Sequence, residues 1–364
     1  MNKIYNFSSG PSMLPIEVMI QAKKEFYNWN NIGSSVLEIS HRSKEFLKLI
    51  KNSKKNLRNL LNIPKNYEIL FCHGGARGQF SSIPMNLTKK KDIVDYIYSG
   101  HWSYQAAKES KKYCNTNIIN VSYVKNKKKF ILPMKKWKIN NQSKYIHYCP
   151  NETIEGISID EEPNFKNKNI IGDFSSTLLS RKINIKKYSL IYASAQKNIG
   201  TSGITIIIIK KKLIKSKNKY IPSILNYKIM LENNSIYNTP TNFSWYLSNL
   251  VFIWLKKIGG LKEIEKRNIE KSKLLYKKID NSDFYINNIT KKNRSCMNVI
   301  FQLKNSKLNN LFLKESNLNN LYALNNHKLF GGMRASIYNA MPIDGVKSLV
   351  KFMSYFEKKY KHEN

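Results

Sequence analysis

The sequence has no long hydrophobic run. Its longest aliphatic stretch covers residues 204–209 and contains Thr205, whereas a membrane helix needs about 20 consecutive apolar residues. The first residues also show no apolar stretch of the kind that directs secretion. We therefore expect a cytoplasmic protein with no membrane association.

Cysteine is scarce, and no two cysteines lie close together in the sequence. The four residues are Cys72, Cys114, Cys149 and Cys296. Wide spacing without a CxxC pair disfavours both a disulfide framework and a zinc site. We expect reduced thiols in the core and no bound metal.

Acidic residues are also few, with 24 Asp and Glu against 62 Lys and Arg and a net charge of +38. Such an excess can indicate binding to nucleic acid or to an anionic membrane. Here the lysines are scattered, as at residues 125–129 and 210–219, and accompany many Asn and Ile residues. No nucleic-acid motif accompanies the charge. We interpret the excess as compositional drift and expect no nucleic-acid partner.

Hydrophobic segments of strand length alternate with helical segments. The predicted strands cover residues 69–72, 93–98, 118–123, 145–148, 169–173, 188–192 and 204–209. This alternation predicts an α/β fold whose mostly parallel sheet has helices on both faces. Ligands bind beyond the carboxyl ends of the strands in such sheets. Four chemically different residues lie at or just past these ends, namely Trp102, Thr153, Asp173 and Lys197.

Helical periodicity predicts helices at residues 17–29, 45–61, 245–255, 261–279 and 343–359. In the first of them, Val18, Ala22 and Phe26 fall on one face. The pair Gly259-Gly260 separates two of these helices and marks a domain boundary. We predict a large domain at 16–258 and a smaller α/β domain formed by 1–15 and 259–364.

The segment YASAQKNIGTSG, residues 192–203, presents a lysine at the end of a buried strand. Small residues precede Lys197, and a second apolar strand follows it. A lone lysine is more often a solvated surface residue in so lysine-rich a chain. A partly desolvated lysine at a strand end is instead typical of lysines that bond covalently to carbonyl compounds.

The segment FCHGGARGQF, residues 71–80, follows a strand and leads into a helix through a glycine-rich turn. Backbone N–H groups and the helix dipole hold phosphate in such a turn. The glycine pattern is neither the dinucleotide fingerprint nor a P-loop. It therefore disfavours a nicotinamide enzyme and an NTPase.

Further motifs occur along nearly the whole chain. They are NFSSGPSMLP at 6–15, EISHRSKEF at 38–46, HYCPNETIEGI at 147–157, DFSS at 173–176, YNTPTNFSWY at 237–246 and GGMRASIYNAM at 331–341. In this order they resemble the phosphoserine aminotransferase family, a fold-type I, class V group of pyridoxal-phosphate enzymes. The resemblance implies a large domain with a seven-stranded type of sheet, a smaller C-terminal α/β domain and pyridoxal 5'-phosphate as cofactor.

The resemblance also implies roles for the residues that contact the cofactor. Lys197 would bond to the aldehyde and later move a proton, while Asp173 would keep the pyridine nitrogen protonated. Trp102 would stack on the ring, and Thr153 would bond the 3'-oxygen. The phosphate would be held by Ala76, Arg77, Gln196, Asn238 and Thr239. The last two come from the partner subunit in the family, which implies a homodimer.

Substrate anions would meet a group of cationic residues. By resemblance, Arg334 takes the α-carboxylate, and Ser9 lies near the substrate. The distal anion would be surrounded by His41, Arg42, Arg77 and His327. Two positions depart from the family pattern, with Ala76 where glycine is common and Thr201 where proline is usual. We expect these departures to weaken the hold on the cofactor slightly.

The implied reaction transfers the amino group of L-glutamate to 3-phosphooxypyruvate, giving O-phospho-L-serine and 2-oxoglutarate in serine biosynthesis. Formation of 4-phosphooxy-L-threonine in pyridoxine biosynthesis stays open. A cysteine desulfurase of the same class would need a nucleophilic cysteine on a mobile loop, and Cys72 and Cys149 fall at strand ends instead. A basic, non-enzymatic binding protein is the third alternative; it would bind DNA or heparin in a salt-sensitive way.

Overall fold

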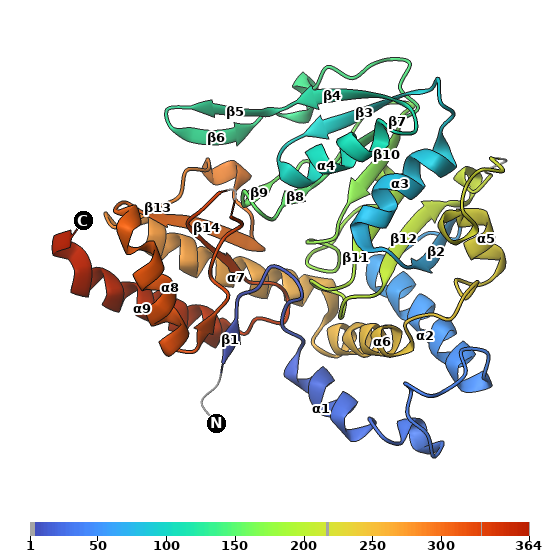
Figure 1. Ribbon diagram of the computed structural model, residues 1–364, viewed down its shortest axis with the longest axis horizontal. Coiled ribbons are helices and arrows are strands. Elements are labelled where there is room, and N and C mark those ends of the chain that lie inside the picture. Colours follow the sequence, from blue (N-terminus) through green and yellow to red (C-terminus); the bar gives the residue numbers. More distant parts are fainter. Residues whose placement is uncertain (1–3, 216–217, 329, 364) are drawn as a thin grey trace.

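The computed structural model describes residues 4–215, 218–328 and 330–363 and contains a central seven-stranded sheet (Figure 1). In spatial order its strands are β2 (Tyr67–Cys72), β12 (Thr205–Lys210), β11 (Leu190–Ser194), β10 (Asn169–Asp173), β7 (Tyr145–Tyr148), β3 (Ile93–Tyr98) and β4 (Asn115–Asn120). All neighbouring pairs from β11 to β4 are parallel, whereas β12 runs antiparallel to both β11 and β2. The predicted mostly parallel sheet is confirmed.

Helices cover both faces of this sheet because alternate residues of each strand point to opposite sides. On one face lie α3 (Gly75–Leu87), α4 (His101–Ser110) and α5 (Tyr227–Glu232), whose apolar residues pack with Leu70, Ile171 and Tyr192. On the other lie α2 (Lys44–Leu61) and α6 (Asn242–Lys257), which pack with Phe71, Ile146 and Ile191. The sheet is therefore buried on both sides.

The C-terminal part has its own apolar core, to which the N-terminal Phe7 contributes. This part contains the antiparallel strands β13 (Tyr285–Ile286), β14 (Asn298–Leu303) and β16 (Met333–Ser336) and the helices α7 (Gly260–Asp280), α8 (Asn309–Leu318) and α9 (Ile343–Tyr360). The first strand, β1 (Tyr5–Asn6), pairs in parallel with β15 (Leu321–Tyr322). The N-terminal strand thus joins the C-terminal part, while the predicted boundary near Gly259 stays a prediction.

Two hairpins extend from the sheet. One joins β5 (Ser122–Lys125) to β6 (Lys128–Ile131), and the other joins β8 (Asn151–Glu152) to β9 (Ile157–Ser158). In the described ranges, no helix combines the length and the apolar character needed to cross a bilayer.

Three local predictions were wrong. The first helix, α1 (Ile16–Lys24), is shorter than residues 17–29, and Phe26 is 40% exposed. Asn28, inside the predicted range, has φ −141° and ψ 83°, which an α-helix cannot contain. The single strand expected at 118–123 is split, because β4 stays in the central sheet while β5 pairs with β6. Cys296 is exposed rather than in the core.

Candidate active site

A cavity of about 360 Å³ lies beyond the carboxyl ends of the parallel strands. The structure brings most of the predicted site residues to its wall. They are Ser9, Ala76, Arg77, Trp102, Thr153, Asp173, Gln196, Lys197, His327 and Arg334. These residues come from segments far apart in the sequence, and the strand ends bring them together.

Four predicted residues are not part of this wall. Arg42, Asn238 and Thr239 are exposed, and His41 is half-buried. The loops that carry them are neighbours, because the Asn242 side chain donates to the carbonyl oxygen of Ile39 at 2.9 Å. All four therefore belong to one region of the surface outside the cavity of their own chain.

Asp173 and Lys197 form the polar centre of the cavity. Asp173 ends β10, and its carboxylate accepts a hydrogen bond from the Ser175 N–H at 2.9 Å. Burial raises the pKa of Asp173, although its hydrogen bonds and Lys197 oppose the shift. Desolvation lowers the pKa of Lys197, with Asp173 opposing and Arg334 adding to the shift. The lysine is therefore more readily deprotonated than a surface lysine.

The N-terminal arm fixes the loop that carries Lys197. The Ser12 hydroxyl donates to the Lys197 carbonyl oxygen at 2.6 Å, and the Ser12 N–H donates to Gln196 at 3.0 Å. Gly10 has a φ of 139°, and a Cβ there would lie 3.3 Å from the Gln196 side chain. Glycine is needed at this position for both conformation and close approach.

The glycine-rich turn leads directly into α3. Gly74 and Gly75 have φ angles of 85° and 61°, in the left-handed region that favours glycine. Among the described residues, no side chain caps the first turn of the helix. Gly75, Ala76 and Arg77, the first residues of the helix, line the cavity, and the start of a helix suits an anion.

Trp102 lies in the first turn of α4. Its indole Nε1 donates to the Thr153 hydroxyl oxygen at 2.9 Å. Because that hydroxyl accepts this bond, its own proton remains available for a second acceptor. The backbone of the same helix turn is held by Glu152 and Glu155, for which the sequence predicted no role. Their position in the NETIEGI motif, beside Thr153, was the available signal.

Arg77 lies close to Trp102 at the cavity wall, where two histidines also lie close together. The Arg77 guanidinium lies 5.6 Å from the centre of the Trp102 ring, and the rings of His101 and His327 are 5.7 Å apart. Burial and the nearby charges of His327 and Arg77 lower the pKa of His101. His101 was not predicted from the sequence. The two arginines of the cavity wall, Arg77 and Arg334, favour a ligand with more than one negative charge.

Cys149 also lines the cavity, but its chemistry is unlike that of a nucleophile. It is buried, and burial together with the nearby carboxylates of Glu152 and Asp173 raises its pKa well above the ordinary value. A thiol in this state is protonated and poorly reactive. The cysteine-desulfurase alternative is therefore not supported by this residue.

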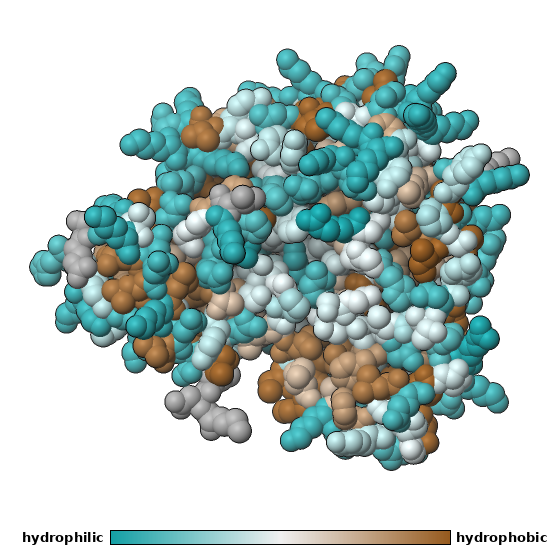
Figure 2. Space-filling model, viewed as in Figure 1, coloured by the Kyte–Doolittle hydropathy of each residue, from teal (hydrophilic) through white to brown (hydrophobic). Residues whose placement is uncertain are grey.

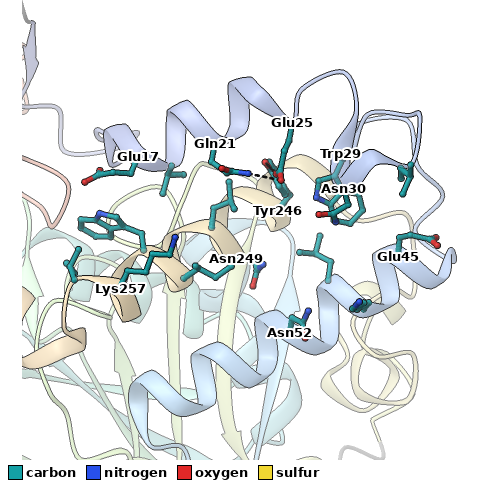
Figure 3. A pocket seen from close by; sticks show the side chains of 18 residues that line it. Glu17, Gln21, Glu25, Trp29, Asn30, Glu45, Asn52, Tyr246, Asn249 and Lys257 are labelled. Carbon is teal, nitrogen blue, oxygen red and sulfur yellow. Dashed lines mark hydrogen bonds between the residues drawn. The ribbon is translucent and has the colours of Figure 1, made fainter.

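A larger cavity, of about 920 Å³, lies between α1, α2 and α6 (Figure 3). Its wall includes Glu17, Glu25 and Glu45, and the Glu25 carboxylate bonds to the Tyr246 hydroxyl and to Gln21. It lacks the combination of lysine, buried carboxylate and arginines found at the strand ends. We therefore assign the candidate active site to the smaller cavity, on chemistry rather than on size.

Comparison with known proteins identifies close relatives. Residues 4–349 match the family model described as Aminotransferase class-V. The chain is 60% identical over 365 residues to the phosphoserine aminotransferase of Buchnera aphidicola subsp. Baizongia pistaciae, with 98% of each chain covered. A solved phosphoserine aminotransferase, in which radiation damage of the Schiff base was described, has a TM-score of 0.95 and 39% identity, over 99% of this chain and 100% of that chain. The phosphoserine aminotransferase of Trichomonas vaginalis with bound PLP has a TM-score of 0.91 and 36% identity, over 97% and 100%.

Proposed function

The chain belongs to the class-V aminotransferase family, and we propose that it works as a phosphoserine aminotransferase through the residues of the strand-end cavity. It transfers the amino group of L-glutamate to 3-phosphooxypyruvate in the cytoplasm, giving O-phospho-L-serine for serine biosynthesis. One observation carries the assignment of the site: a desolvated lysine and a buried aspartate share one cavity with two arginines.

The cavity fits pyridoxal 5'-phosphate. When bound, this cofactor supplies an aromatic ring that withdraws electrons from the substrate Cα. The uncapped start of α3 suits its phosphate, and the Thr153 hydroxyl has a proton to donate to its phenolic oxygen. Asp173 would hold a proton on the pyridine nitrogen, and Trp102 would cover one face of the ring. The Gln196 side chain would add a contact to the phosphate.

Lys197 would hold the cofactor covalently and would transfer the proton at the substrate Cα. Its lowered pKa favours the neutral amine that both tasks need. The adjoining Asp173 carboxylate offsets part of the cost of a cation at Nζ when the proton arrives. The bonds from Ser12 hold the loop while this proton moves.

Substrate recognition rests on the cations. Arg334 would bind the α-carboxylate, because its forked guanidinium can donate two parallel bonds. Arg77 and His327 would bind the distal phosphate or the side-chain carboxylate of glutamate, with Ser9 nearby. A dianionic phosphate engages more of this cluster than a carboxylate does, so the site favours phosphorylated substrates.

We further infer that two copies of the chain complete each other's sites. Asn238 and Thr239 would reach the cofactor phosphate of the partner, and His41 and Arg42 would reach its substrate anion. Their common location outside the cavity supports this arrangement. Figure 2 shows hydrophobic surface over α1 and α6, where Ile16 and Ile20 are 68% and 62% exposed. Burial of such residues would stabilise a homodimer.

Borohydride reduction of the holoenzyme tests the assignment. Peptide mass spectrometry should find the pyridoxyl group on Lys197, and Lys197→Met should abolish the label. Lys271, which is also buried, serves as the matched control and should carry none. Labelling of another lysine would overturn the assigned site, and with it the role of Asp173.

A further inference from the structure

We propose that Glu152 is a positioning residue that holds Trp102 over the cofactor by anchoring the first turn of α4. The proposal rests on the function proposed above, because it takes the Trp102 indole to face the bound cofactor. Glu152 itself is not part of the cavity wall. It would act through the residue that it holds.

Two carboxylates from the hairpin that joins β8 to β9 accept hydrogen bonds from the first backbone N–H groups of α4. Glu152 accepts hydrogen bonds from the N–H groups of Trp102 and Ser103, both at 2.9 Å. Glu155 accepts a bond from the His101 N–H at 2.7 Å. The first three N–H groups of the helix thus have carboxylate acceptors, at the helix end where negative charge is favourable.

The same hairpin also holds the indole ring. Thr153, next to Glu152, accepts the bond from Trp102 Nε1 at 2.9 Å. Trp102 is therefore held through its backbone by one residue and through its side chain by the next. Two attachment points from one rigid segment fix both the position and the tilt of the ring.

Gly100 allows the start of α4 to lie close to the hairpin that carries Glu152 and Glu155. Gly100, the residue before α4, has a φ of −175°, which any residue can adopt. A Cβ there would nevertheless lie 2.7 Å from Glu152 Cγ and 2.8 Å from Glu155 Oε2. Gly100 is thus required by space and not by conformation. Glu152 is fully buried, so its contacts cannot be replaced by solvent.

A residue that only caps α4 and a residue that positions the Trp102 ring should respond differently to mutation. Helices are usually capped by a nearby Ser, Thr, Asp or Asn, whereas here the acceptor comes from 50 residues away in the sequence. Loss of a cap that only stabilises the fold should lower stability without a specific effect at the ring. Loss of a positioning residue should matter only while the Trp102 ring is present.

The test is a double-mutant cycle read by cofactor binding. Apoenzyme is titrated with pyridoxal 5'-phosphate, and Kd is measured for wild type, Glu152→Gln, Trp102→Ala and the double variant. Glu152→Gln replaces one of the two carboxylate oxygens by an NH2 group, so that one of the two N–H groups loses its acceptor, and should weaken binding roughly tenfold. In the Trp102→Ala background it should add no further loss. The near-UV circular dichroism of apoenzyme should also change with Glu152→Gln.

Gly100→Ala should also displace Glu152, because the added methyl group would collide with the Glu152 side chain. It should weaken cofactor binding in the Trp102 background and not in the Trp102→Ala background, even if Glu152→Gln does not fold. Glu263→Gln, at a partly exposed side chain of α7, is the matched control and should leave Kd unchanged. Wild-type Kd in Glu152→Gln, or losses that add in the double variant, would overturn the proposal. Failure of wild-type apoenzyme to bind the cofactor would instead overturn the proposed function.

Discussion

The Nη1 atom of Arg334 donates to the carbonyl oxygen of Thr153 at 3.4 Å. The Arg334 Nε atom is buried and has no hydrogen-bond partner in the described part of the chain. A buried donor without an acceptor is unfavourable, and a carboxylate in the cavity would supply one. The hairpin that holds Trp102 thus also orients the arginine expected to bind the substrate.

Arg334→Lys should impair glutamate and phosphoserine alike, because both substrates carry the α-carboxylate. Lysine keeps the charge but loses the fork. The loss of one charge-assisted bond corresponds to about 10- to 100-fold in kcat/KM. Steady-state kinetics with each substrate measure it. An effect confined to one substrate would contradict the assigned role.

His327→Asn should affect phosphoserine more than glutamate, since a dianionic phosphate engages more of the cation cluster. Serine, which has no distal anion, should react orders of magnitude more slowly than phosphoserine in the wild-type enzyme. The ratio of kcat/KM for the substrates is the measurement. Equal rates for serine and phosphoserine would show that the cluster does not select the substrate.

A mixture of Thr239→Ala and Lys197→Met subunits should regain activity after subunit exchange. If Thr239 serves the partner's site, one of the two hybrid sites contains both intact residues. Exchange is followed with differently tagged subunits, and activity is compared with each variant alone. The pair Thr153→Ala and Lys197→Met is the control: both residues line the cavity of one chain, so its hybrid contains two singly mutant sites and no intact one. Proven exchange without rescue of the first pair would exclude shared sites.

Glu155→Gln should change the pH dependence of stability. Burial and the charge of Glu152 raise the pKa of Glu155 to about 7, with Lys129 opposing the shift. The folded protein therefore binds this proton more tightly than the unfolded chain, and the resulting stability is lost as pH rises from about 4.5 through 7. Relative to wild type, the variant should be more stable at pH 8 than at pH 5, by the order of 1–3 kcal/mol. Urea unfolding at the two pH values measures this, and Glu263→Gln should show no such gain.

Lys271→Met should destabilise the fold without altering the site. The Lys271 Nζ atom is buried in α7 and donates to the carbonyl oxygens of Ile337, Tyr338 and Met341, at distances of 3.1, 2.6 and 3.0 Å. Methionine would leave these acceptors without that donor, at a cost of roughly 1–3 kcal/mol. Denaturant unfolding measures the loss. Lys273→Met, at an exposed position of the same helix, should have almost no effect.

Much of the fold could be predicted because strands and helices leave local patterns. The strands β3, β7 and β10 begin and end where the sequence predicts, and α2 begins one residue early. The first helix ended sooner than predicted, since its apolar pattern continues past Lys24 while the backbone is no longer helical at Asn28. The antiparallel direction of β12 was not predicted, because a buried strand has the same pattern in either direction.

The sequence by itself determined the alternation of strands and helices, the strand-end position of Lys197 and Asp173, and the glycines of the phosphate-type turn, because each depends on neighbours along the chain. Only the tertiary structure decided that Glu152 and Glu155 accept hydrogen bonds from the first N–H groups of α4, and that His41 and Arg42 lie outside the cavity of their own chain. Those relations join residues from distant segments. Their geometry depends on the path of the whole chain, which no local spacing of residues records.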